Sequence, residues 1–114
     1  MIVNQKNQHF KAGVSHFNQK EFYEAHEEWE EIWLVSDGDQ KLFLQTLILI
    51  AGAGVHFQKD RPNPALRLLK LAQNKMEIIK NENVYWIEKP LLEDFVNRWP
   101  EIWNLGESRL PESA

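Results

Sequence analysis

Apolar residues recur at helical spacing along most of this chain. Phe10, Val14 and Phe17 stand at positions i, i+4 and i+7, which is the apolar stripe of an amphipathic helix. Signals for β-strands are nearly absent. The pattern therefore predicts an all-α protein, a small antiparallel bundle of four to five helices, with its first helix at about residues 5–17.

The next two helices are separated by the short sequence SDGD, in which Gly38 is typical of a helix end. We expect one helix from about residue 22 to 35 and another over residues 40–58. Because the connection is short, the two helices should be antiparallel. The apolar residues of the segment 40–58 go nearly all the way round the helix, so it is predicted to be the buried central helix.

Polar residues that accept backbone hydrogen bonds indicate where these helices begin. Asn18, followed three residues later by Glu21, predicts a capping box at the start of the second helix. Phe17 and Phe22 flank this start and are predicted to pack on each other. Asp39 is the predicted cap of the third helix.

Prolines mark the later helices. Asn63 followed by Pro64 predicts the cap and first residue of a fourth helix, which ends near Asn81. Pro90 predicts the start of a short last helix that closes before Pro100, because proline disfavours the helical conformation of the residue before it.

Length and composition limit the class of protein. The chain has 114 residues, of which 43% are apolar, and this suits one helical domain over residues 1–105 with a loose tail at 106–114. A net charge of −4 argues against nucleic-acid binding, and the absence of cysteine excludes disulfides and thiolate catalysis. The first ten residues lack the apolar core of a signal peptide. The longest apolar run is short for a membrane span, so we expect a cytoplasmic protein without a membrane partner.

Candidate chemistry is concentrated in the segment FYEAHEEWEEIW, residues 22–33. On a helical wheel His26 and Glu30 lie next to each other at the edge of the apolar face, and Tyr23 and Glu27 continue this strip outward. The remaining acidic side chains point into solvent: Glu24, Glu28 and Glu31. An imidazole and a carboxylate four residues apart can bind one divalent ion, such as Zn, Mn, Fe or Ni. They can equally form a hydrogen-bonded pair at the edge of the core.

The third helix offers further polar groups on one face. Counting outward from the turn places Glu30 level with Leu44, so Gln45 is predicted to join the cluster. His56 follows roughly 12 Å further along the helix, which disfavours a site that contains both histidines. A buried amide such as that of Gln45 needs hydrogen-bond partners.

The stretches FNQKEFYEAHEEWEEIWL, FLQTLILIAGAGVHFQK and NPALRLLKLA together resemble the bacterial and archaeal family catalogued as domain of unknown function 309. The resemblance covers about Phe10 to Ile79 and implies a helical bundle distantly like tetratricopeptide helices. Members are sometimes labelled predicted metal-dependent hydrolases. This chain has Thr46 where relatives often carry a small residue such as glycine. The family motif falls here on Glu24, His26, Glu27, Glu30, Trp33, Gln45 and His56.

Two functions of different classes are consistent with these residues. In a metal-dependent hydrolase, His26 and Glu30, together with His56 or Gln45, would bind the ion, and Glu27 would be the general base for a bound water. The pocket would be lined by Tyr23, Glu24, Trp33, Gln45 and Gly52. In a non-catalytic module, the same polar groups would fix the helix register, and the five tryptophans would serve binding of a protein or self-assembly into a homo-oligomer. The partner, a small molecule or a protein, stays open.

Overall fold

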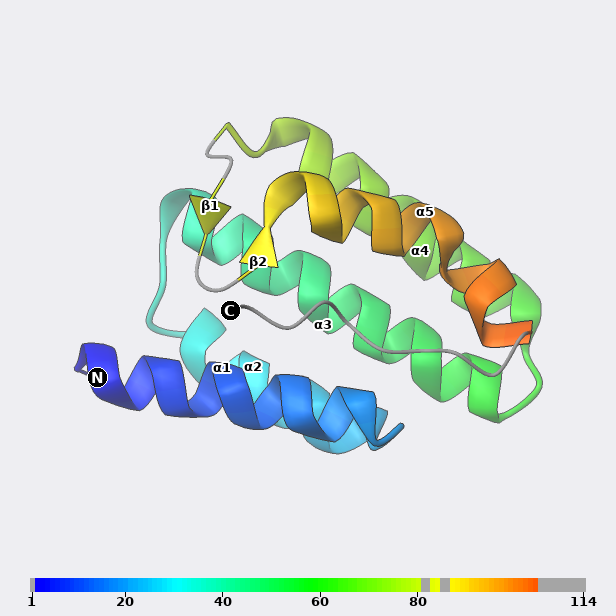
Figure 1. Ribbon diagram of the computed structural model, residues 1–114, viewed down its shortest axis with the longest axis horizontal. Coiled ribbons are helices and arrows are strands. Elements are labelled where there is room, and N and C mark those ends of the chain that lie inside the picture. The colour runs from blue at the N-terminus through cyan, green and yellow to red at the C-terminus, as the bar shows by residue number, and fades with distance from the viewer. Residues whose placement is uncertain (1, 81–82, 85–86, 105–114) are drawn as a thin grey trace.

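The computed structural model describes residues 2–80, 83–84 and 87–104 and confirms the predicted all-α bundle (Figure 1). Two short strands, β1 and β2, pair antiparallel between the last two helices, with Val84 opposite Ile87. The elements are α1 Val3–Asn18, α2 Phe22–Trp33, α3 Gly38–Gln58, α4 Pro62–Ile78, β1 Asn83–Val84, β2 Ile87–Glu88 and α5 Lys89–Asn104. The predicted tail at 106–114 lies outside the described residues.

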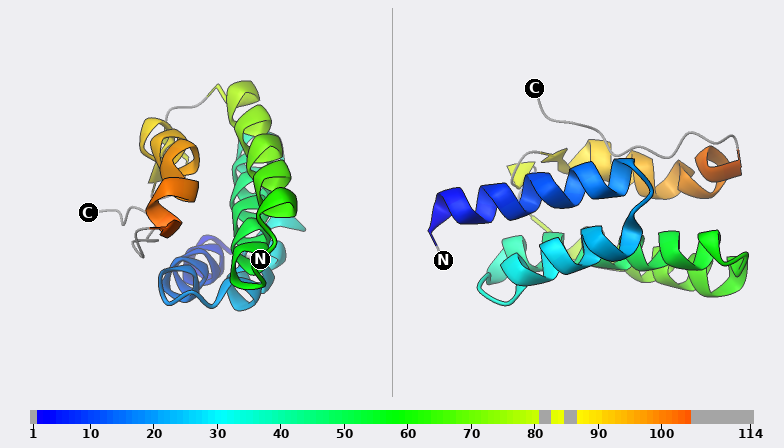
Figure 2. Two further views of the ribbon diagram at one scale, coloured as in Figure 1. Left: turned by 90° about the vertical axis from the view of Figure 1, so that its right-hand side faces the viewer. Right: turned by 90° about the horizontal axis from the view of Figure 1, so that it is seen from below.

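The helices form two layers. Figure 2 shows α1 and α5 on one side of the molecule and α2, α3 and α4 on the other. Helix α3 is the middle member of its layer, because α2 packs along one of its flanks and α4 along the other. The prediction that the segment 40–58 forms the central helix is therefore confirmed.

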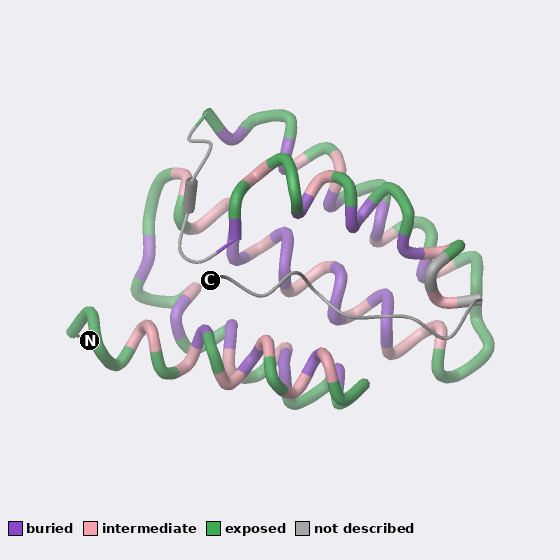
Figure 3. Tube along the Cα trace, viewed as in Figure 1, coloured by how far each residue is buried: buried purple, intermediate pink, exposed green. Residues whose placement is uncertain are grey.

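Aromatic side chains fill the space between the two layers. Phe17 on α1 lies 4.9 Å from Phe22 and 5.1 Å from Trp99, measured between ring centroids. The rings of Phe57 and Trp103 continue this cluster towards the end of α5, with centroids 5.5 Å apart. Such edge and tilted contacts each add about 0.5–1.5 kcal/mol beyond the apolar area that they bury. Figure 3 shows that the buried positions face this interior.

Two glycines let the largest side chains of α2 reach the interior. A Cβ atom at Gly13 would lie only 2.1 Å from Nε1 of Trp29, and one at Gly54 would lie 2.5 Å from the Phe22 ring. The same Nε1 atom donates a buried hydrogen bond of 3.2 Å to the carbonyl oxygen of Phe10. The absence of a side chain at Gly13 and at Gly54 therefore leaves the space that Trp29 and Phe22 occupy.

The predicted capping box at the start of α2 is wrong. Helix α1 continues through Asn18, and Glu21 is the residue before α2. The corner is made by Lys20, whose φ of 62° lies in the left-handed region. The edge-to-face contact of Phe17 with Phe22 fixes this corner, so the predicted contact is present although the predicted cap is not.

The predicted start of α3 is displaced by two residues. Asp37 precedes the helix, and Gly38 is its first residue, with a φ of 57° that suits glycine. Asp39 does not cap its own helix. Its carboxylate accepts a hydrogen bond from the backbone N–H of Lys80, 3.3 Å away, and so ties the start of α3 to the end of α4.

Prolines also act differently from the prediction. Helix α4 starts at Pro62 rather than Pro64, since either proline fits a first turn. Helix α5 does not close before Pro100 but continues through it to Asn104. Trp99 and Trp103 both contact the ring of Phe57, and this packing holds the last turn in place despite the backbone donor that proline lacks.

Helix α3 is long and apolar enough to cross a membrane, and 44% of its most apolar stretch is buried within the protein. A core helix can have the same length and composition, and the position of α3 between α2 and α4 is that of a core helix. Its outward side is nevertheless half-buried rather than covered.

We expect Gly13→Ala to lower the free energy of unfolding by about 1–3 kcal/mol, because the new methyl group overlaps Trp29. The free energy lost through this overlap should outweigh the gain of about 1 kcal/mol that alanine brings over glycine in helix propensity. Chemical denaturation followed by circular dichroism measures it. Gln8→Ala, at an exposed position of the same helix, should change stability by less than about 0.5 kcal/mol. Equal stability of the two variants would contradict the tight packing of Gly13 on Trp29.

Candidate functional site

An open hollow of about 380 Å³ on the protein surface is lined by three of the motif residues of α2, His26, Glu27 and Glu30. All of the described residues around it belong to α2 or follow directly after it. They are Tyr23, His26, Glu27, Glu30, Glu31 and Leu34. These residues follow the i, i+3, i+4, i+7, i+8 spacing of a single helix face, which therefore presents a phenol, an imidazole and three carboxylates together.

His26 and Glu30 lie together, as their spacing predicts. Nδ1 of His26 is 3.4 Å from Oε2 of Glu30, and the two side chains are 35% and 49% exposed. The pair is therefore open to solvent, not enclosed between helices. Exposed ion pairs of this kind contribute about 0–1 kcal/mol to stability.

Tyr23 covers one end of this hollow. Its ring stacks on the imidazole of His26, with centroids 6.5 Å apart and an interplanar angle of 12°. A hydrogen bond to the Glu27 carboxylate and the negative charge of that group raise the pKa of the Tyr23 phenol above 10.0. The nearby charges of Glu24 and Glu30 act in the same direction, since each disfavours the phenolate.

The other predicted pocket residues do not line the hollow. Glu24 on α2 is not among the lining residues, and Trp33 lies beneath the ammonium group of Lys41, which is 4.6 Å from the ring centroid. Gly52 faces Leu68 on α4, whose Cδ1 atom would be 3.1 Å from an added Cβ. Gln45 is half-buried on α3.

Thr46, the neighbour of Gln45 on α3, adds no ligand to the hollow. It is fully buried and donates its hydroxyl proton to the carbonyl oxygen of Leu42, so this hydroxyl is turned to its own helix. The contact of Phe22 with Gly54 places the start of α2 beside the end of α3, so the two helices are antiparallel as predicted.

His56 lies in the last turn of α3, near the corner that joins α1 to α2. Gln58, two residues further along α3, donates a hydrogen bond of 2.7 Å to the carbonyl oxygen of Lys20 in this corner. The Nδ1 atom of His56 is buried and has no hydrogen-bond partner among the described residues. The structure thus keeps His56 apart from His26, as the axial offset in the sequence suggested.

The remaining histidines pair with acidic residues across the α1–α2 corner. Nδ1 of His9 is 2.7 Å from the Glu28 carboxylate, and Nδ1 of His16 is 3.0 Å from that of Glu21. The sequence gave no signal for these pairs, because they join residues 19 and 5 positions apart on different elements. Glu28 is consequently engaged and is not a free solvent-facing charge.

The donor groups around the hollow do not make a complete metal site. Two ligands, His26 and Glu30, come together, while Glu27 is hydrogen-bonded to Tyr23 and His56 is elsewhere. Within residues 2–80, 83–84 and 87–104, no group of three or more His, Cys, Asp or Glu side chains is arranged to bind a metal ion. Zinc and related ions usually need three or four protein ligands.

A second feature, the outer face of the α2–α3–α4 layer, was only partly visible in the sequence. It is the side of this layer that faces away from α1 and α5. On the α2 side, this face is bordered by Trp33, which lies beneath Lys41 of α3. On the α4 side, it is bordered by Leu68, which lies beside Gly52 of α3. The part of α3 on this face is half-buried and mostly apolar: Leu42, Gln45, Ile48, Leu49, Gly52, Val55 and His56. A wheel of α3 places these residues within one arc.

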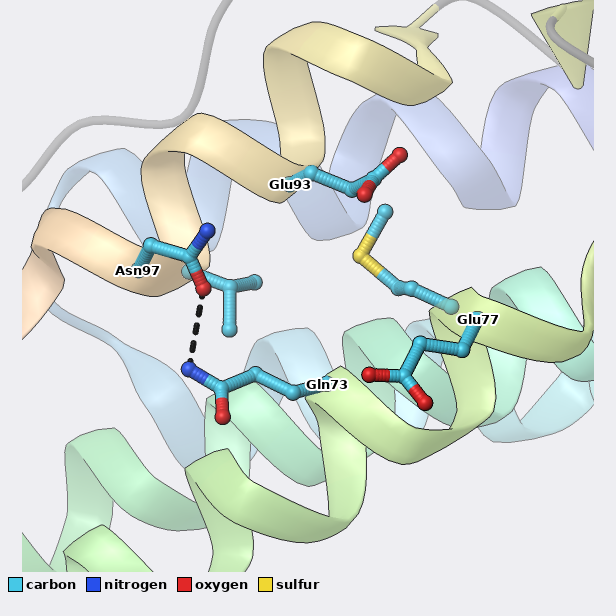
Figure 4. A pocket seen from close by; sticks show the side chains of 6 residues that line it. Gln73, Glu77, Glu93 and Asn97 are labelled. Carbon is cyan, nitrogen blue, oxygen red and sulfur yellow. Dashed lines mark hydrogen bonds between the residues drawn. The ribbon is translucent and has the colours of Figure 1, made fainter.

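A smaller hollow of about 170 Å³ separates α4 from α5. A hydrogen bond of 2.9 Å from Gln73 to Asn97 crosses between the two helices. Figure 4 shows Glu77 on α4 and Glu93 on α5, whose carboxylates lie on either side of this hollow. The amides of Gln73 and Asn97 are already bonded to each other, and two carboxylates lie nearby. This hollow is therefore a polar contact region between α4 and α5.

The fold and the site define a small all-helical protein with an acidic, aromatic helix face. The chain belongs to the family described as domain of unknown function (DUF309), whose model matches residues 10–68. These residues run from Phe10 through the hollow to the first half of α4. No curated protein and no solved structure matches the chain.

We expect the Tyr23 phenol to titrate above pH 10 and its pKa to fall towards 10 in Glu27→Gln, which removes the adjacent negative charge. The absorbance of tyrosinate measures it in a Tyr85→Phe background, because the chain has two tyrosines. Glu31→Gln is the matched control, since Glu31 lines the hollow without raising this pKa. Equal shifts in both variants would disprove the direct contact.

Proposed function

We propose that this protein is a non-catalytic helical module that binds another protein through the outer face of its α2–α3–α4 layer. The observation that carries the proposal is the half-buried apolar arc of α3. An apolar helix at the centre of a layer gains most when both of its sides are covered, and each Å² of apolar surface removed from water contributes about 25 cal/mol. Within the described part of the chain, only the inward side of α3 has that cover.

The border of the outer face supports a protein partner. On α4, Leu71 is 47% exposed and Ile78 is 58% exposed, and both extend the apolar arc of α3. On α2, Leu34 is 63% exposed beside the acidic strip. Apolar residues that form a patch with a polar rim are typical of interaction sites.

The polar cluster on α2 fits the same proposal. Tyr23, His26 and the surrounding carboxylates are exposed and lie at the edge of the outer face. Aromatic rings with polar tips are enriched at interfaces, and a rim of like charge selects partners by sign. The cluster therefore serves recognition, and it does so without a bound metal.

Metal content tests this proposal against the hydrolase alternative. Protein purified without chelator should contain far less than one equivalent of Zn, Mn, Fe or Ni by elemental analysis, because only His26 and Glu30 are placed as ligands. His26→Ala should leave that content unchanged. A stoichiometric ion that is lost in His26→Ala would contradict the proposal and support a metal-dependent hydrolase.

Photo-crosslinking tests the location of the binding face. We expect a benzoylphenylalanine at Leu71, on the outer face, to form an adduct with one protein in the producing cells, identified by mass spectrometry. The same group at Leu91, which is 50% exposed on α5 in the other layer, should not form it. An absence of adducts at Leu71, or equal adducts at both positions, would refute the proposed face.

A further inference from the structure

We propose that the partner of the outer face is a second copy of this chain, in a two-fold symmetric dimer. This inference rests on the proposed function and names the protein that the outer face binds. It is based on the charges that flank α3, which have opposite signs on its two sides.

The α2 side of the outer face is acidic. Glu27, Glu30 and Glu31 are exposed there in consecutive helical turns, with no basic residue anywhere in α2 apart from His26. Repulsion within this strip is felt by Tyr23, whose pKa the carboxylates raise. A cationic surface placed opposite would remove that repulsion.

The α4 side of the outer face is cationic. Arg67 is exposed and Lys75 is half-buried on the flank that continues from Leu68. The only acidic residue of α4 is Glu77, and it lines the hollow on the other side, against α5. The outer face of one molecule therefore carries an acidic edge and a cationic edge, with the apolar arc of α3 between them.

Two-fold symmetry matches these edges to each other. An axis that lies in the interface and runs parallel to α3 sets the apolar arc against its own copy. The same rotation brings α2 of each protomer opposite α4 of the other, so that both acidic edges meet cationic edges. A closed dimer thus covers the apolar arc and pairs the charges at once.

Charge reversal tests the dimer in the purified full chain. Wild-type protein should sediment as a dimer whose dissociation depends on concentration. The acid-reversed variant, Glu27→Lys with Glu30→Lys, and the base-reversed variant, Arg67→Glu with Lys75→Glu, should each weaken dimerisation at least about tenfold. An equimolar mixture of the two should restore a dimer that contains one of each, because both edges are then complementary again.

A control separates this effect from net charge. Glu88→Lys with Glu101→Lys makes the same change in charge at exposed positions on β2 and α5, away from the outer face, and it should leave dimerisation unchanged. Circular dichroism should show the same helix content in all variants. Failure of the mixture to restore the dimer would overturn the inference, as would a wild-type monomer at all concentrations.

The outcome also distinguishes this inference from the proposed function. A monomeric purified chain whose Leu71 position crosslinks to a different protein would overturn the dimer and leave the binding module intact. Binding of the purified chain to vesicles of neutral lipid, lost in Leu49→Lys, together with no protein adduct at Leu71, would overturn both, because a membrane would then cover the apolar arc.

Discussion

The close contact of two large α2 side chains with two glycines holds this structure together. Trp29 rests on Gly13 of α1, and Phe22 rests on Gly54 of α3. Because any larger residue at either glycine would occupy the same space as an aromatic ring, these contacts set the separation and the register of three helices at once. The aromatic cluster around Phe17 then joins this unit to α5.

The same contacts decide which chemistry reaches the surface. With one side of α2 fixed in the core, its opposite side presents Tyr23, His26 and the carboxylates to solvent as a single strip. A metal centre would need ligands from a second helix at the same level. The described residues that line the hollow instead all belong to α2 or follow directly after it. An exposed acidic strip beside a half-buried apolar helix suits recognition of another surface better than catalysis in a closed pocket.

Much of this architecture could be predicted from the sequence, because helical periodicity is a local property. The apolar stripes gave the helices and the central place of α3, and the spacing of His26 and Glu30 gave their contact. Helix ends were less predictable. Asn18 and Asp39 are good caps in isolation, but Asn18 ends α1 and Asp39 binds the backbone of Lys80, 41 residues away in sequence. Pro100 stays within α5 since two tryptophans pack around the last turn.

The sequence by itself determined the helical class, the acidic face of α2 and the apolar character of α3, since each depends only on residue type and a period of 3.6. Tertiary structure decided the rest. The packing of α2 on α3, in which Phe22 contacts Gly54, leaves Gln45 and His56 outside the lining of the hollow, and no local pattern encodes this contact. Which arc of α3 stays half-buried was likewise decided by the packing of α2 and α4 on its flanks, because an almost wholly apolar helix has no preferred side of its own.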